Sequence, residues 1–238
     1  MRRIVLDCPL TLGQEIEFTS SQAHYLFKVL RLQAGTKILG LDSTGRAYII
    51  ELASTPGLGM VLAEAEEDQG EPNLAISVYV PLLKGDKLDL VVQKAVELGA
   101  TAICLVSTQR CIVNWAGKEA KKLARLQKIA QSATEQCRRH KVPLVQGVFS
   151  LAEVSANPGI FPWEQEHSTS LQQYLHQYPP QGRLSILTGP EGGLTDQEAK
   201  TLTDSGWAPV TLGTRILRAE TAAIVSLACT MFACGEMG

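Results

Sequence analysis

The chain has 238 residues, of which 45% are hydrophobic and 19% charged, and its formal net charge is −2 at pH 7. These values are typical of a soluble globular protein with one large or two ordinary domains. The longest apolar stretch, 222–235, is too short to span a bilayer, so no membrane association is expected. Asp7 and Pro9 interrupt the apolar run that would make the N-terminus a secretory signal, and we expect a cytoplasmic protein.

The cysteines and histidines show no pattern that predicts a disulfide framework or a metal site. The six cysteines include no C-x-x-C pair and no regular spacing, so we expect reduced thiols. The four histidines share no metal-ligand spacing, so no metal is expected. The residues concerned are Cys8, Cys104, Cys111, Cys137, Cys229, Cys234, His24, His140, His167 and His176.

The charge is distributed unevenly along the chain. Residues 1–72 carry 6 basic and 10 acidic side chains, residues 73–147 carry 12 and 5, and residues 148–238 carry 4 and 9. The middle third therefore holds the positive charge. A localised basic face can bind an RNA backbone even on an acidic protein, because phosphate contacts act over a screening length of roughly 10 Å.

Residues 1–72 alternate short strand patterns with turns, which predicts a small, mostly β domain. Ser43-Thr44-Gly45 predicts a hairpin turn. One helix interrupts the strands, with Ser20 or Ser21 as its N-cap. The acidic run 64–71, with Glu66, Glu67 and Asp68, is interpreted as a solvated linker that ends at Pro72. The expected strands are 3–6, 15–18, 36–42, 46–52 and 60–64.

Residues 73–238 predict a larger α/β domain. A buried strand over 74–83, an apolar helical stripe that stops at Gly99 and a strand over 101–107 form a β-α-β unit of a parallel sheet. A long helix is expected over 118–139, with basic residues at both of its ends. Residues 150–182 predict a loop region with one short helix near 171–178, and no chemistry is assigned to them.

A glycine-rich turn follows the strand pattern 184–188. It reads Gly189-Pro190-Glu191-Gly192-Gly193, and Thr195 with Glu198 predicts a capping box at the start of the next helix. Neither phosphate-loop order, G-x-x-x-x-G-K-[ST] or G-x-G-x-x-G, is present, and Glu191 would repel a phosphate. The turn suits a ligand that is cationic or offers hydrogen-bond donors, although a tight turn without a ligand remains the alternative.

A second turn follows the strand pattern 209–213. Arg215, Arg218, Glu220 and Thr221 crowd four polar groups between that strand and an apolar helix expected over 222–233. A plain connection would not need these groups. Because ligands bind at the ends of adjacent strands in an open α/β sheet, the two turns predict one cofactor pocket.

These two motifs resemble a known family. The first turn, together with Leu212-Gly213-x-Arg215-Ile216-Leu217-Arg218-x-Glu220-Thr221-Ala222, is similar to the RsmE-type 16S ribosomal RNA uridine-N3 methyltransferases of the SPOUT superfamily. Further runs extend the resemblance through most of the chain. They are His24-x-x-x-x-Val29-Leu30-Arg31, Lys84-Gly85-Asp86-Lys87, Lys94-Ala95-Val96-Glu97-Leu98-Gly99 and Glu135-Gln136-Cys137-x-Arg139.

The resemblance implies a fold and an activity. It implies a PUA-like RNA-binding β-barrel over 1–72 and a SPOUT-type parallel-sheet methyltransferase domain, knotted as a trefoil, over 73–238. It implies methylation of N3 of a uridine in 16S rRNA of the small ribosomal subunit by a homodimer that uses S-adenosylmethionine. Two alternatives remain open: a SPOUT methyltransferase acting on another RNA site, and a non-catalytic RNA-binding assembly factor.

The resemblance also implies site residues. Arg215, Arg218 or Arg139 would stabilise the uracil anion, and Glu191, Glu220 or Glu135 would take the N3 proton, with no choice among the carboxylates. The expected cofactor-binding residues are Leu187, Thr188, Gly189, Glu191, Gly192, Leu212, Gly213, Ile216, Leu217, Arg218 and Thr221.

The expected RNA-binding residues are basic side chains from both domains. A solvated basic face, or basic residues that complement a helix dipole, is the alternative for those on the long helix. The residues are Arg2, Arg3, Arg31, Lys121, Lys122, Arg125, Arg138 and Arg139.

Overall fold

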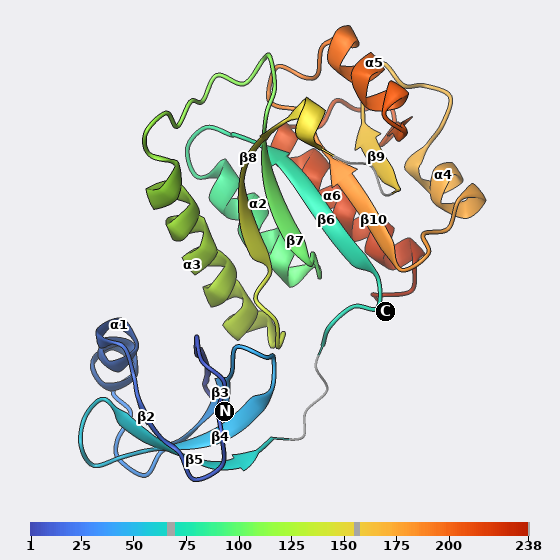
Figure 1. Cartoon of the computed structure of the whole chain (residues 1–238). Coiled ribbons are helices and arrows are strands. Elements are labelled where there is room, and N and C mark those ends of the chain that lie inside the picture. The colour runs from blue at the N-terminus through green and yellow to red at the C-terminus, as the bar shows by residue number, and fades with distance from the viewer. Residues whose placement is uncertain (66–69, 155–157, 238) are drawn as a thin grey trace. The chain divides into compact units, whose positions relative to one another are not determined.

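The computed structural model describes residues 1–65, 70–154 and 158–237 (Figure 1). The chain divides into two compact units: Met1–Glu71 with Thr134–Lys141, and Pro72–Ala133 with Val142–Gly238. The first division falls next to the boundary that Pro72 predicted. The assignment of residues 134–141 to the first unit had no sequence signal. The linker residues Glu66, Glu67 and Asp68 lie outside the described residues.

The first unit is built on a curled five-stranded sheet with the order β1-β3-β4-β5-β2. Strands β1 and β3 pair in parallel, and the other pairs are antiparallel. The inward side chains form one core that includes Leu26, Ile38 and Ile50. The strands are β1 (Arg3–Val5), β2 (Glu15–Glu17), β3 (Lys37–Leu41), β4 (Ala47–Leu52) and β5 (Leu58–Glu64).

The predicted hairpin turn joins β3 to β4. One carboxylate oxygen of Asp42 accepts hydrogen bonds from the N–H groups of Thr44 at 2.8 Å and Arg46 at 2.9 Å, which closes the turn. The helix prediction was wrong by one residue. Thr19, not Ser20 or Ser21, caps α1 (Ser20–Ala23), because the side chains of Thr19 and Gln22 bond each other's backbone N–H. A π-helical turn, η1 (His24–Val29), continues α1.

The second unit is built on a six-stranded sheet in which every neighbouring pair is parallel. The strand order is β11-β9-β10-β6-β7-β8. Strands β6, β7 and β8 follow one another toward one end of the sheet, and the later strands extend the sheet on the other side of β6. The direction in which strands are added therefore reverses between β6 and β10. The strands are β6 (Ala75–Pro81), β7 (Ala102–Ser107), β8 (Leu144–Ser150), β9 (Gly159–Pro162), β10 (Arg183–Leu187) and β11 (Trp207–Val210).

Helices cover this sheet. The helices α2 and α6 pack on each other and lie behind the sheet in Figure 1, and α6 also contacts β10 and β6. A separate apolar cluster, which includes Phe161, Leu202 and Trp207, joins α5 to the strands. No helix of the described residues is both long and apolar enough to cross a membrane. The elements are α2 (Lys87–Glu97), α3 (Glu119–Cys137), η2 (Leu151–Glu153), α4 (Leu171–Gln177), α5 (Asp196–Asp204) and α6 (Ala219–Ala233).

The largest error of the sequence prediction concerns residues 150–182. The expected short helix is α4, but the segment also contains β9, which lies between β10 and β11 in the sheet. Four residues ending in Pro162 are too short to show a strand pattern. Gly159 is needed where it stands, because a Cβ there would lie 2.5 Å from the ring of Trp207.

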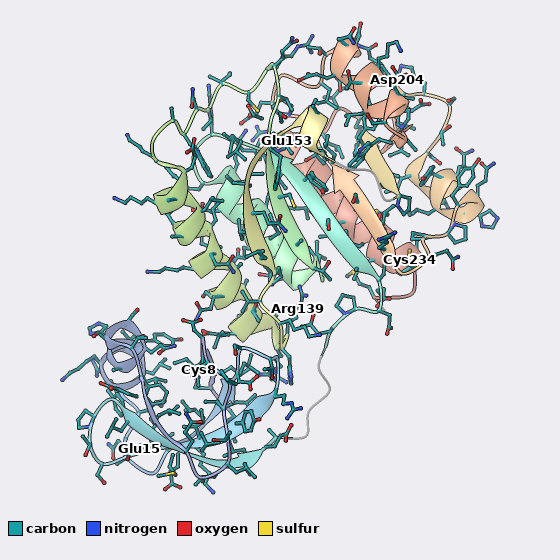
Figure 2. The ribbon with its side chains drawn as sticks, in the orientation of Figure 1. Cys8, Glu15, Arg139, Glu153, Asp204 and Cys234 are labelled. Carbon is teal, nitrogen blue, oxygen red and sulfur yellow. The ribbon has the colours of Figure 1, made fainter. Side chains whose placement is uncertain are left out.

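Glu71 organises the segment that closes the first unit. One of its carboxylate oxygens accepts hydrogen bonds from the N–H groups of His140 and Lys141, both at 3.0 Å, and the other is 2.8 Å from a guanidinium nitrogen of Arg139. Arg139, labelled in Figure 2, follows the end of α3 and its side chain is only 4% exposed. Burial raises the pKa of Glu71, but the hydrogen bonds from Arg139 and the backbone lower it further, and the net pKa lies below its usual value of 4.5.

We predict that Glu71→Gln lowers the free energy of unfolding at neutral pH. We also predict that the free energy of unfolding of this variant changes less with pH in the acid range. Because the folded pKa is depressed, ionised Glu71 stabilises the fold fully above pH 4.5, and this contribution disappears as the pH falls through the folded pKa. We expect a loss of about 1 kcal/mol at pH 7, kept small by solvent screening, and a smaller difference near pH 3. Urea unfolding measures both.

The exposed Glu15→Gln in β2, labelled in Figure 2, is the control and should change stability at neither pH. A loss in Glu71→Gln that is as large near pH 3 as at pH 7 would contradict the role given to its charge.

Candidate active site

One pocket opens where three neighbouring strands of the second unit end. The strands β9, β10 and β11 are adjacent and parallel, so their carboxyl ends lie at the same edge of the sheet. The segments that follow them surround a cavity of about 600 Å³. Its lining contains 162–164 and His167 after β9, 189–194 after β10, 211–219 and Ala222 after β11, and Lys87 at the start of α2.

The turn after β10 is tight, and its glycines allow close contacts within the protein. The N–H of Gly193 donates to the carbonyl of Pro190 at 2.9 Å, and Gly193 has a φ of +71°, which favours glycine. A Cβ on Gly189 would lie 3.2 Å from the backbone nitrogen of Leu194, across the turn. The predicted capping box at Thr195 is present and begins α5. The turn is therefore closed by its own backbone, and all of residues 189–193 line the pocket.

Arg110, which the sequence analysis did not select, holds this turn from the far side. Its guanidinium donates to the carbonyl of Gly192 at 2.9 Å and to that of Leu194 at 3.3 Å. A Cβ on Gly192 would lie 3.1 Å from the Cβ of Arg110, so the missing side chain allows the contact. Arg110 belongs to the connection between β7 and α3. No sequence pattern indicated this contact, because Arg110 and Gly192 are far apart along the chain.

Glu191 does not point freely into the pocket. Its Oε1 lies 3.3 Å from the N–H of Lys84 and 3.2 Å from the Nζ of Lys87, and both groups donate to it. Burial raises the pKa of Glu191, but hydrogen bonds from its own N–H, from Lys84 and from Lys87 lower it more, and the net pKa lies below the usual range. A carboxylate with a lowered pKa is a weak proton acceptor near neutral pH.

The segment after β11 supplies the opposite wall. Gly213 has a φ of +107°, and the side chains of Arg215, Ile216 and Arg218 are exposed beside the pocket, Ile216 to 83%. The helix α6 begins at Ala219, one turn earlier than predicted, so Glu220 lies in its first turn. Glu220 is buried, with 8% of its surface exposed.

The structure brings most of the predicted cofactor-binding residues to the pocket. Leu187 and Thr188 are buried at the end of β10, and neither they nor Thr221 are among the lining residues. The predicted cofactor residues that do line it are Gly189, Glu191, Gly192, Leu212, Gly213, Ile216, Leu217 and Arg218.

The third wall was missed by sequence reasoning. Trp163, Glu164 and His167 line the pocket after β9. The carboxylate of Glu164 lies against Gly193, and the buried indole nitrogen of Trp163 has no hydrogen-bond partner among the described residues. No sequence signal marked this wall, because the four-residue strand β9 that positions it is too short to show a pattern.

Two predicted catalytic residues belong to the first unit, whereas every lining residue of the pocket belongs to the second. Glu135 accepts a hydrogen bond from the N–H of Val5 at 3.0 Å, and Arg139 pairs with Glu71. Their contacts within the first unit give both side chains a structural role there.

The predicted RNA-binding residues divide into free and engaged side chains. Lys121 and Lys122 are exposed on α3, whereas Arg125 forms an ion pair with Asp89 of α2. In the first unit Arg2 and Arg31 are exposed, and Arg31 has a φ of +53°. Arg3 donates to the carbonyl of Arg138 at 2.9 Å, and the side chain of Arg138 is exposed.

Comparison with known proteins identifies the family. The RNA methyltransferase domain family matches residues 70–231. The ribosomal RNA small subunit methyltransferase E of Synechocystis is 33% identical over 95% of this chain and 76% of its own length. That of Bacillus subtilis is 33% identical over 88% of this chain and 86% of its own. The chain belongs to the ribosomal RNA small subunit methyltransferase E family.

Solved structures support the family assignment. One is the ribosomal RNA small subunit methyltransferase E of Neisseria gonorrhoeae, which was solved bound to S-adenosylmethionine. Its sequence is 32% identical to this chain, and the two structures superpose with a TM-score of 0.87 over 97% of each chain. A putative methyltransferase of Legionella pneumophila in complex with the same cofactor is 26% identical with a TM-score of 0.88, again over 97% of both chains. The predicted α/β fold with a parallel sheet is thereby confirmed.

Proposed function

We propose that this chain transfers the methyl group of S-adenosylmethionine to N3 of one uridine in 16S rRNA. Membership of the family supports the broader part of this proposal, namely that the chain is an S-adenosylmethionine-dependent methyltransferase of small-subunit ribosomal RNA. The observation that supports a donor site in this chain is the single pocket formed by both glycine-bearing turns. The N3 position itself rests on the resemblance of those turns to the uridine-N3 enzymes.

The pocket residues fit S-adenosylmethionine. A cavity of about 600 Å³ lies within the range of small-molecule sites, about 300–1,000 Å³. Residues 189–194 and 211–219 line the cavity and would supply peptide groups for an adenine or a ribose, and the indole nitrogen of Trp163 is a buried donor with no partner among the described residues. When bound, S-adenosylmethionine supplies an electrophilic methyl group on a sulfonium.

The chain's own residues would hold and activate the acceptor base. N3 of uracil carries a proton and becomes nucleophilic when that proton passes to a base or to water, which leaves an anion spread over the ring. The exposed guanidinium groups of Arg215 and Arg218 beside the pocket are suited to stabilise this anion. Glu191 is held by Lys84 and Lys87 and is poorly basic, so we assign it a binding role rather than proton transfer.

The rest of the proposal concerns how RNA and a second subunit are engaged. We assign RNA binding to the first unit, as a PUA-like domain, and to the exposed lysines of α3. We also propose that residues 73–238 form the knotted trefoil of SPOUT enzymes and that the chain acts as a cytoplasmic homodimer through α6. Phe232 on α6 has 72% of its surface exposed, and a partner at that helix would cover it.

We predict that small ribosomal subunits lacking the modification gain one methyl group on a single 16S uridine when incubated with this protein and isotope-labelled S-adenosylmethionine. Mass spectrometry of rRNA fragments locates the label. A block to reverse transcription distinguishes N3, because a methyl group there prevents base pairing. Arg215→Met should slow the reaction by on the order of a hundredfold. Label on another base, on another RNA or nowhere would reject the proposal.

We predict that Lys121→Glu with Lys122→Glu weakens binding to small-subunit RNA and flattens the dependence of affinity on salt. Each lost phosphate contact reduces the slope of log affinity against log salt by about one. Fluorescence anisotropy across a salt series measures it. Lys200→Glu, on the exposed face of α5, is the matched control, and Arg125 is left unchanged because it pairs with Asp89. An unaltered slope in the double variant would make the face a solvated surface only.

A further inference from the structure

Three charged side chains meet at the wall of the donor pocket, and two of them, Lys87 and Glu191, line it. The ammonium of Lys87, in the first turn of α2, lies 3.2 Å from a carboxylate oxygen of Glu191 and 3.4 Å from Oε2 of Glu220. Glu191 belongs to the turn after β10, and Glu220 to the first turn of α6. One cation therefore connects three segments that are remote in sequence, and it also lines the pocket.

Glu220 depends on this cation. It is 8% exposed, and its Oε2 receives no hydrogen bond in the described part of the chain. The 3.4 Å contact with Lys87 is an ionic contact that lacks hydrogen-bond geometry. A buried carboxylate without a compensating charge is strongly unfavourable, because it has lost its hydration and gained nothing in return.

Two carboxylates share one ammonium here. Without the positive charge, Glu191 and Glu220 would be two like charges brought together in a partly buried site, and they would repel each other. Glu191 is free to respond, because it lies on a turn, whereas Glu220 is anchored in α6. Loss of the cation would therefore move the turn, which forms one wall of the pocket.

We propose that Lys87 is a positioning residue of the donor pocket: its ammonium holds the carboxylates of Glu191 and Glu220 together and so fixes the 189–193 turn against the start of α6. The effect on donor binding rests on the proposed function. The effect on the fold of the second unit does not. Lys87 acts through the two carboxylates, so its loss should be corrected by removing the buried charge that it compensates.

The experiment measures ligand affinity by calorimetry with the full-length protein. Lys87→Met should weaken S-adenosylmethionine and the neutral product S-adenosylhomocysteine alike, by on the order of tenfold, because the shared wall is displaced. Lys87→Arg should retain most of the affinity. Adding Glu220→Gln to Lys87→Met should restore both ligands to within about threefold of the single Glu220→Gln variant. Lys94→Met, on the same helix, removes a lysine that pairs with Glu97 and should change nothing.

Two results would overturn the proposal. Unchanged affinity in Lys87→Met would remove any role for the cation. A loss that Glu220→Gln does not correct would mean that Lys87 contacts the ligand itself and does not act through the carboxylates.

Thermal unfolding without ligand separates this proposal from the function. Lys87→Met should lower the Tm by about 3 °C or more, and Glu220→Gln should recover most of the decrease. If the wild-type protein binds no S-adenosylmethionine while this pattern of Tm values appears, the proposed function fails and the charge arrangement stands. If the Tm is unchanged in Lys87→Met, the positioning role fails whatever the protein binds.

Discussion

The parallel pairing of β9 with both β10 and β11 is the constraint on which the site depends. Parallel neighbours end at the same edge, so three segments separated by as much as fifty residues must leave the sheet side by side. Strands β6 and β7 are parallel to these three, so the segments that follow them leave at the same edge and supply Lys87 and Arg110. A pocket at this place follows from topology before any side chain is considered.

Side chains then determine the shape of that pocket. The 189–193 turn has few atoms of its own to hold it, because three of its five residues are glycines. Arg110 fixes its carbonyls from one side, and Lys87 fixes its carboxylate from another. The glycines allow close contacts with Leu194 and Arg110, and charged groups from outside the turn supply the rigidity that glycine lacks. This division of roles explains how a flexible sequence can form a defined binding wall.

The sequence predicted the features that are local. The turns at Gly189 and Gly213, the capping box at Thr195 and the β3–β4 hairpin are each encoded within a few neighbouring residues, and all are present. What it could not predict depends on contacts across the chain. Arg110 and Lys87 reach the turn from segments about eighty and one hundred residues earlier, and no periodicity marks them. The wall after β9 was lost because a four-residue strand has no readable pattern. Glu135 and Arg139 were selected through a motif, and their contacts with Val5 and Glu71 in the first unit had no sequence signal.

Calorimetric titration of S-adenosylmethionine into the wild-type protein and into Gly189→Val tests whether the two turns form one donor pocket. A side chain at position 189 would press on the backbone of Leu194, 3.2 Å from the added Cβ, and open the turn. Gly147→Val in β8, where a Cβ meets nothing closer than 4.0 Å, controls for the substitution itself. The structure predicts a wild-type complex, unchanged binding in the control and affinity reduced by at least about tenfold in Gly189→Val. Equal affinity in all three proteins, or no binding by the wild type, would contradict it.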